Sequence, residues 1–481
     1  DRDSFDFSID EPGDGKLEVD TFNLTLNWDV AGGTITNIFA TREQDNSTVS
    51  DIDSQPIWLF HSDTDSTYEQ WSNELRYNGL FMDERLNLTT GIYMFESELA
   101  YDENRRLLGV LTGVGLPALS QEGGGYLDVE SMGIFASADY DLTDRLTLTA
   151  GIRWTDEEKD TRSTNLPLNN APCYIGSPNG PDYAFATTEC TADFIDNKSW
   201  SFLSPKLGFM YELTDNSRVY GSVTQGYRSG GYNLRNTEVP TGFAADGTAI
   251  YEFGPGPFDE EEATSWEIGY KSEWSRGQLN ASAYLTQISD QQREVNLPST
   301  VSGVLQLIQN TADTDIMGLE IDGTFAVSDN FTVLASLGVI DAEYTSVRFD
   351  LNGDGVIDSA DKDLDLPRAP ELTYSISAIY DLQLGDLGYL SSRISYAYRD
   401  ETFFTDNNLG YILEQEVLDI YLDFYTAGGS WTLSMYGRNL LDTVRHGNDT
   451  QLGFIGPVPV NGTLAPLGAP ATLVFEVSYS F

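Results

Sequence analysis

Histidine is nearly absent from this sequence, and no stretch is apolar enough to cross a membrane as a helix. The two histidines, His61 and His446, are far apart in the chain, so neither a zinc site nor a Ser/His/Asp triad stands out. A membrane helix needs about 18 uncharged apolar residues. The most apolar stretch, 107–119, contains three glycines and is expected to be a loop. An enzyme is therefore the weakest functional interpretation.

Basic residues are also scarce: there are 26 Lys and Arg residues against 76 Asp and Glu residues, a formal net charge of −50. Such a chain repels phosphate backbones, which excludes nucleic acid as a partner. The charge suits a surface that is bathed in cations or high salt. Aromatic residues make up 12% of the sequence, which argues against a disordered chain.

Cysteine occurs only twice, at Cys173 and Cys190. The residues between them include a cluster of turn formers at 178–181. We expect a local disulfide that ties an exported loop, here 158–198. The alternative is a pair of unbonded thiols.

The strongest positive signal is a period of two, in which apolar and polar residues alternate over long stretches. The clearest stretches are 132–142, 146–154, 266–274, 418–424 and 473–481. Either a soluble sandwich with one wet face or a membrane barrel with a watery lumen gives this pattern. Alternation past about ten residues and aromatic residues at strand ends favour the barrel.

The connections between these stretches are alternately short and long. Short turns are expected at 31–33, 82–84, 143–144, 214–216, 275–277, 328–330, 384–386 and 427–429. Long connections are expected near 44–66, 97–127, 158–198, 229–263, 290–312, 346–370, 401–416 and 442–470. Outer-membrane barrels have short periplasmic turns and long extracellular loops. The sequence therefore predicts an all-β fold, an antiparallel transmembrane β-barrel in the bacterial outer membrane.

Counting around these turns gives about seventeen strands for residues 19–481, the barrel portion, whereas bacterial single-chain barrels have even numbers. The first strand, near 21–30, leads into a short turn and thus runs toward the periplasm. Residues 1–18 are therefore expected to be the end of an extracellular loop.

The parity of this count also predicts where the two ends of the chain lie. Asp1 is expected on the extracellular side, opposite Phe481, and the first strands of the barrel are expected to precede Asp1. The alternative is one further strand at Phe5, Phe7 and Ile9, which would make the count even.

Several short blocks occur in a fixed order along the chain. They are Ser-Pro-Lys-Leu-Gly at 204–208, Gln-Gly-Tyr-Arg-Ser-Gly-Gly-Tyr-Asn at 225–233, Glu-Glu-Ala-Thr-Ser-Trp-Glu-Ile-Gly-Tyr-Lys at 261–271, Asn-Thr-Ala at 310–312, Gly-Leu-Glu at 318–320 and Tyr-Gly-Arg-Asn-Leu-Leu-Asp at 436–442. Together with the terminal Phe481 they resemble the TonB-dependent outer-membrane receptors. The resemblance spans about 130–481 and continues more weakly to about Val19.

The resemblance implies active uptake, in which extracellular loops capture a scarce nutrient and an N-terminal plug inside a barrel of about 22 strands responds to TonB. No block here matches the plug or the segment that contacts TonB, so that contact is expected through a missing N-terminal region. The ligand that the resemblance implies is a ferric siderophore or a similar iron complex. Cobalamin, haem and glycans are further family ligands, and haem is disfavoured because histidine is scarce.

One segment has the spacing of a calcium loop, within the predicted extracellular loop 346–370. Its ligand positions 1, 3, 5, 7, 9 and 12 are Asp350, Asn352, Asp354, the Val356 carbonyl, Asp358 and Asp361. Position 6 is Gly355, which permits the sharp turn, and this set of oxygen atoms suits Ca²⁺. The segment resembles an EF-hand or dockerin loop with Asp in place of Glu at position 12. The alternative is an acidic turn.

Arg228, Tyr232 and Asn233 are candidates for ligand contact, because they follow a strand where it leaves the membrane for a long loop. The alternative is an aromatic girdle with an interior charge that pairs with a carboxylate. Outer-membrane lipid and lipopolysaccharide are the expected partners of the apolar face. Two other functions remain open: a passive porin, and a calcium-dependent surface binding protein.

Overall fold

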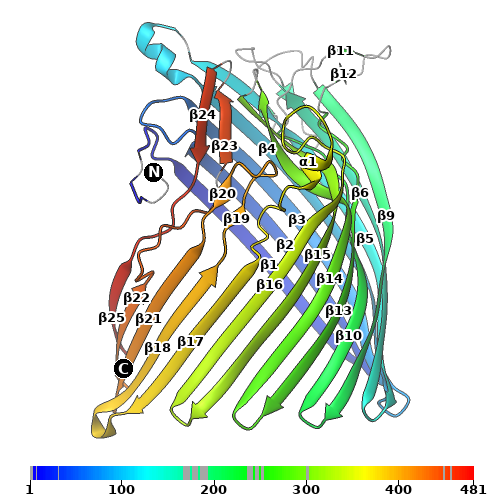
Figure 1. Ribbon diagram of the computed structural model, residues 1–481. Helices are drawn as coiled ribbons and strands as arrows, with labels where there is room; N and C mark the ends of the chain where they lie inside the picture. The colour runs from blue at the N-terminus through cyan, green and yellow to red at the C-terminus, as the bar shows by residue number, and fades with distance from the viewer. Residues whose placement is uncertain are drawn as a thin grey trace.

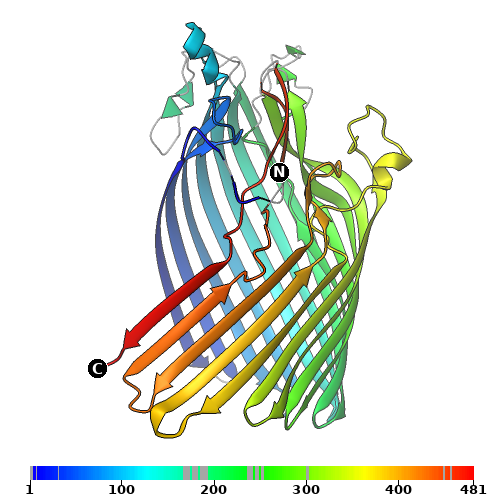
Figure 2. The same cartoon turned by 60° about the vertical axis from the view of Figure 1, so that its left-hand side comes forward.

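The computed structural model describes residues 4–6, 8–30, 32–116, 118–165, 174–175, 183–184, 193–235, 242–243, 249–250, 254–299, 303–447, 450–455 and 458–481. Most of these residues belong to one antiparallel sheet of 17 strands, which curves into the wall of a barrel (Figures 1 and 2). The all-β fold class predicted by the alternation is confirmed.

The strands of this sheet follow one another in chain order, and each pairs with the next. They are β1 (Asp14–Val30), β2 (Gly33–Asp51), β3 (Phe60–Phe81), β4 (Leu86–Leu107), β5 (Leu119–Thr143), β6 (Leu146–Asn165), β9 (Asp193–Thr214), β10 (Ser217–Arg228), β13 (Glu261–Trp274), β14 (Gly277–Ser299), β15 (Gly303–Ser328), β16 (Phe331–Val347), β17 (Leu372–Gln383), β18 (Gly388–Arg399), β21 (Gln415–Thr426), β22 (Trp431–Arg438) and β25 (Thr472–Tyr479).

The two ends of the wall differ. At the end shown lowest in Figure 1, which we call the turn end, successive strands are joined by the eight short turns that the sequence predicts. At the opposite end, the loop end, the connections hold the remaining elements. These are η1 (Gly109–Val114), β7 (Tyr174–Ile175), β8 (Tyr183–Ala184), β11 (Gly242–Phe243), β12 (Ala249–Ile250), α1 (Ser359–Lys362), β19 (Thr402–Phe403), β20 (Tyr411–Ile412), β23 (Thr450–Ile455) and β24 (Val458–Leu464); η2 (Gly385–Leu387) lies in a short turn.

The apolar face of the strands is exposed rather than enclosed. Leu148, Ile152 and Phe475 are 39%, 48% and 69% exposed, and Tyr270 is half-buried. Because side chains two residues apart share a face, the same face of these strands carries a continuous apolar belt. This is the arrangement of a barrel whose outer surface faces lipid. None of the described helices has the length and apolar character that crossing a membrane would require.

Strands β1 and β25 are the two edges of the sheet, and within the described residues they do not pair with each other (Figure 2). Within a lipid bilayer, the backbone N–H and C=O groups along such edges need hydrogen-bond partners, because each unpaired group costs several kcal/mol. Strand β1 begins at Asp14, whereas the sequence predicts a first strand near 21–30 after a loop end at 1–18. Residues 14–20 belong to the strand because they continue the ladder with β2. The strands expected before Asp1 stay a prediction.

Most strands extend further toward the loop end than the sequence predicts. The connection expected near 44–66 is only 52–59, and the one expected near 97–127 is 108–118. Toward the loop end the apolar alternation gives way to charged side chains, such as Glu98 and Glu103 of β4, while the backbone ladder continues. The loop end also holds the buried apolar clusters, such as Phe60 with Leu107 and Leu108.

Candidate functional site

The loop end carries a segment that folds across the ends of several strands, Ser229–Arg235, which we call the rim segment. It contains two of the three residues predicted to contact a ligand. The ammonium group of Lys159, on β6, binds the first two residues of the rim segment. It donates to the Ser229 hydroxyl at 2.8 Å and to the Gly230 carbonyl at 2.7 Å. Lys159 also pairs with Glu157 at 3.0 Å, so a half-buried cation anchors the rim segment to the wall.

Tyr232 is 7% exposed, and its hydroxyl donates to the Asp196 carboxylate at 3.1 Å. Its ring contacts Phe194 and the edge of Trp200. Burial, together with the nearby Asp196 charge, raises the pKa of the Tyr232 phenol. The phenol therefore stays neutral and serves as a hydrogen-bond donor within the wall.

Asn233 is 6% exposed and fastens the rim segment to β15. Its side-chain amide donates to the Ile308 carbonyl at 3.2 Å, and its side-chain oxygen accepts from the Ile308 N–H at 2.8 Å. Arg228, by contrast, is exposed at the last position of β10. It lies on the face opposite Val219 and Val223, which is the interior face of the barrel. A ligand role for Arg228, Tyr232 and Asn233 stays a prediction.

Next to the rim segment lies a buried ion-pair cluster that the sequence did not reveal. Glu103 and Arg105 of β4 are 3% and 2% exposed, and the Arg105 Nε lies 3.0 Å from a Glu103 oxygen. The Ser62 hydroxyl and the Arg235 guanidinium also donate to Glu103, at 2.9 and 3.4 Å. The partners Glu103 and Arg235 are separated by 132 positions, so no local pattern could have indicated the contact.

Burial alone would raise the pKa of Glu103. Arg105 and Arg235 outweigh that effect and hold the pKa of this carboxyl at about 2. Burial, and after it the Glu103 charge, raises the pKa of Tyr101 to about 12. The cluster thus stays ionised at any physiological pH and fixes β3, β4 and the rim segment to one another.

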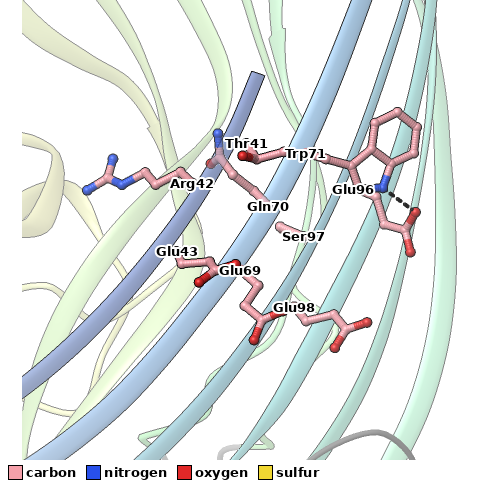
Figure 3. A pocket seen from close by; sticks show the side chains of 9 residues that line it. All are labelled: Thr41, Arg42, Glu43, Glu69, Gln70, Trp71, Glu96, Ser97 and Glu98. Carbon is pink, nitrogen blue, oxygen red and sulfur yellow. Dashed lines mark hydrogen bonds between the residues drawn. The ribbon is translucent and has the colours of Figure 1, made fainter. Parts of the chain in front are cut away.

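A pocket of about 230 Å³ lies across β2, β3 and β4 on the outward face (Figure 3). Glu43, Glu69 and Glu98 are neighbours in the strand register, and Figure 3 shows their side chains grouped, with Arg42 pointing away. The Trp71 indole donates to Glu96 at 2.7 Å. Four carboxylates in one pocket repel an anionic ligand, so this pocket does not suit a negatively charged iron chelate.

The pocket is part of a longer acidic row. In register, Glu98 is followed by Asp128 of β5 and then by Asp160 of β6. Both lie on the outward face above the apolar belt, since Met132 and Ile152 are the exposed apolar residues of the same face. Burial, followed by the charges of Glu98, Asp160 and Glu96, raises the pKa of Asp128 to about 6.

The calcium-type loop follows β16. Asp350 accepts hydrogen bonds from the backbone N–H groups of Gly353, Asp354 and Gly355, and Gly355 has φ +87°, as position 6 requires. Asp361 is fully buried and accepts from the N–H groups of Leu351, Asn352 and Asp358. The apolar neighbours Leu351 and Leu366 pack on Tyr344 of the wall.

These contacts bear on whether the loop fits Ca²⁺. The donor set is entirely oxygen, which Ca²⁺ prefers. The two carboxylates at positions 1 and 12 are satisfied by the backbone, so a bound ion would have to share Asp350 and replace bonds of Asp361. Calcium binding stays a prediction. Cys173 and Cys190 lie outside the described residues, and their disulfide also stays a prediction.

Comparisons with known proteins agree on the family. The family model described as TonB dependent receptor-like, beta-barrel, matches residues 2–440. The pesticin receptors of Yersinia enterocolitica and Yersinia pestis are 27% and 26% identical over 232 and 234 residues, which cover 48% of this chain and 28% of each receptor.

Solved structures share the fold. The ferric yersiniabactin uptake receptor FyuA from Yersinia pestis aligns with a TM-score of 0.74 at 19% identity, covering 98% of this chain and 63% of that one. The siderophore receptor PiuA from Acinetobacter baumannii aligns with a TM-score of 0.71 at 15% identity, covering 97% and 64%. The chain thus spans less than two thirds of the receptors that it matches. It belongs to the TonB-dependent receptor family, whose β-barrels lie in the bacterial outer membrane.

Proposed function

We propose that this barrel serves TonB-dependent active uptake of a scarce nutrient, with a ferric siderophore or a similar iron complex as the ligand. The observation that carries the proposal is the family match over residues 2–440, together with a sheet whose loop end is rich in polar anchors. The energy-coupling partner in this proposal is the TonB complex. Outer-membrane lipid and lipopolysaccharide are the partners of the apolar belt.

The charge distribution supports an interior route for such a ligand. The outward pocket holds four carboxylates, whereas the interior face presents Arg228 at the top of β10. An anionic ferric chelate is attracted by a cation on its path and is repelled by the outward row. Arg228 is therefore the residue that we propose for a first contact with the ligand.

Uptake and growth measurements test the proposal. Cells that express the receptor from its whole gene are starved for iron and supplied with a panel of ferric chelates carrying radioactive iron. We expect one chelate class to be taken up only when the receptor is present, and Arg228→Ala to reduce that uptake about tenfold or more, as loss of one charged contact does. Arg218→Ala, on the same strand and face at the turn end, is the matched control and should take up iron normally.

Two results would contradict the proposal. Equal entry of unrelated small solutes would indicate a passive porin. Binding of a surface ligand without uptake of any chelate would indicate a surface binding protein.

We also propose that the loop 350–361 binds one Ca²⁺ through Asp350, Asn352, Asp354, the Val356 carbonyl, Asp358 and Asp361. Its affinity should lie in the extracellular range of about 0.1–1 mM. Calorimetry on the detergent-solubilised receptor should show one site that Asp354→Ala removes. Asp386→Ala, in a turn at the opposite end, is the control. If the parent receptor shows no heat of Ca²⁺ binding, the proposal of a calcium site is wrong.

A further inference from the structure

The ends of β2 and β3 hold a second group of metal-ligating side chains, apart from the rim segment and the calcium-type loop. Asp51 is the last residue of β2 and lies directly opposite His61 of β3 in the register. Asp10, in the segment before β1, approaches both. In the part of the chain that the structure describes, these three form the only group of three or more His, Cys, Asp or Glu side chains whose ligand atoms lie within 4.8 Å of one another.

The imidazole of His61 is held in one orientation. The residue is 4% exposed, and its ring stacks on Trp58 at a centroid distance of 5.2 Å and an angle of 8°. Its Nε2 lies 3.1 Å from an Asp10 oxygen. A buried imidazole nitrogen needs a polar partner, and the groups gathered around the His61 imidazole are the carboxylates of Asp10 and Asp51.

The carboxylate of Asp51 is also held in one orientation, by backbone N–H groups of the following residues. One of its carboxylate oxygens accepts from the backbone N–H groups of Asp53 and Ser54, at 3.1 and 2.8 Å. The other oxygen faces Asp10, whose N–H lies 3.3 Å away. Outer-shell bonds of this kind fix the direction in which a ligating carboxylate points.

We propose that His61 Nε2 and the carboxylates of Asp10 and Asp51 bind one divalent transition-metal ion of the Zn²⁺ class. One nitrogen and two carboxylate oxygens form a three-ligand set, and water completes a tetrahedron. Ligand atoms about 2.1 Å from a central ion are about 3.4 Å apart in a tetrahedron. The ligand atoms of the three side chains lie within 4.8 Å of one another. Side-chain shifts of about 1 Å therefore bring them to the spacing of a tetrahedral site. The ion fastens the segment before β1 to the β2–β3 hairpin.

The imidazole separates this site from the calcium-type loop. Zn²⁺ and its neighbours in the transition series bind imidazole readily, whereas Ca²⁺ selects sites made only of oxygen. The two sites are also carried by different strands, so each can be removed without touching the other.

The test is calorimetry with Zn²⁺ on the whole receptor in detergent, after treatment with a chelator. We expect one Zn²⁺ site, weakened in His61→Gln by more than the ~10–100-fold that loss of an outer-shell partner costs. His446→Gln changes the only other histidine and should bind as the parent does. Asp354→Ala, in the calcium-type loop, should also leave Zn²⁺ binding unchanged.

Cobalt provides a second measurement. Co²⁺ in place of Zn²⁺ should give the visible absorption of a tetrahedral site in the parent receptor, and this absorption should be absent in Asp10→Asn. Asp10 lies outside the strands, in the segment before β1, so this variant keeps the wall intact even if His61→Gln disturbs folding. No Zn²⁺ binding in the parent, or equal affinity in the parent and in both variants, would overturn the proposal and leave His61 and Asp10 as a hydrogen-bonded pair.

Discussion

The barrel has a long-strand wall, β2–β6 with β9, and a short-strand wall, β17, β18, β21, β22 and β25. Strand β5 has 25 residues and β17 has 12. Twelve residues tilted by about 40° rise about 30 Å, which is the thickness of the hydrocarbon core. The strands of the long wall reach farther toward the loop end than those of the short wall (Figure 2).

The difference in strand length shows that one strand can have a lipid-facing part and a water-facing part. On the short wall, the apolar alternation of β21 runs from Leu418 to Phe424, which is more than half of the strand. On the long wall, the outward face of β6 is apolar at Leu148 and Ile152 and acidic at Glu158 and Asp160. The lower half of the long wall is therefore a membrane sheet, and its upper half is a water-exposed sheet.

The largest effect should come from the interior of the upper long wall. Glu103→Ala leaves Arg105, which is 2% exposed, without its buried carboxylate. Removing one partner of a buried pair costs ~3–5 kcal/mol. Glu98→Ala, on the outward face of the same strand, is the matched control and should cost much less. Urea unfolding in detergent measures both, and equal losses would contradict the distinction between the two faces.

A somewhat smaller effect should separate the two halves of the outward face. Ile152→Arg places a charge in the apolar belt and should cost ~2–4 kcal/mol. Glu158→Arg, six positions further along the same face of β6, should cost almost nothing because its side chain is in water. Unfolding of the two variants in lipid vesicles is the measurement. A similar cost at both positions would mean that the upper wall is also in lipid.

The smallest effect concerns pH and the acidic row of the upper long wall. The pKa of Asp128 is raised from 3.8 to about 6, so the folded state binds its proton more tightly than the unfolded state. This contribution to stability is complete below pH 3.8 and is lost as the pH rises through about 6. Asp128→Asn should therefore be more stable than the parent at pH 7.5, and the difference should shrink toward pH 5. Apparent melting temperatures at several pH values check this, and a constant difference would contradict it.

The strands could be predicted from the sequence where contact with lipid requires an alternating apolar pattern. Their water-exposed ends could not be predicted, because water requires no such pattern. Alternation is a local signal, so the turns and the apolar residues Leu148, Ile152 and Phe475 could be placed from it. The upper part of β4 has no such signal, because residues such as Glu98 and Glu103 resemble loop composition.

Contacts between distant segments could not be predicted from local alternation. They depend on strand register and on loops that fold back, as in the pair Glu103 and Arg235 and in the cluster of Asp10, Asp51 and His61. Tyr232 and Asn233 are predicted from their position after a strand as candidates for ligand contact. Only the structure shows that their polar atoms bond to Asp196 and Ile308.

The most direct test of the proposed function is the energy dependence of uptake. Initial rates of entry of the active ferric chelate are compared in energised cells, in cells treated with a protonophore and in cells that lack TonB. If uptake depends on TonB, energised cells should show rapid, saturable entry of the chelate, and the other two should show almost none. Equal rates in all three would show a passive channel and contradict TonB-dependent transport through this barrel.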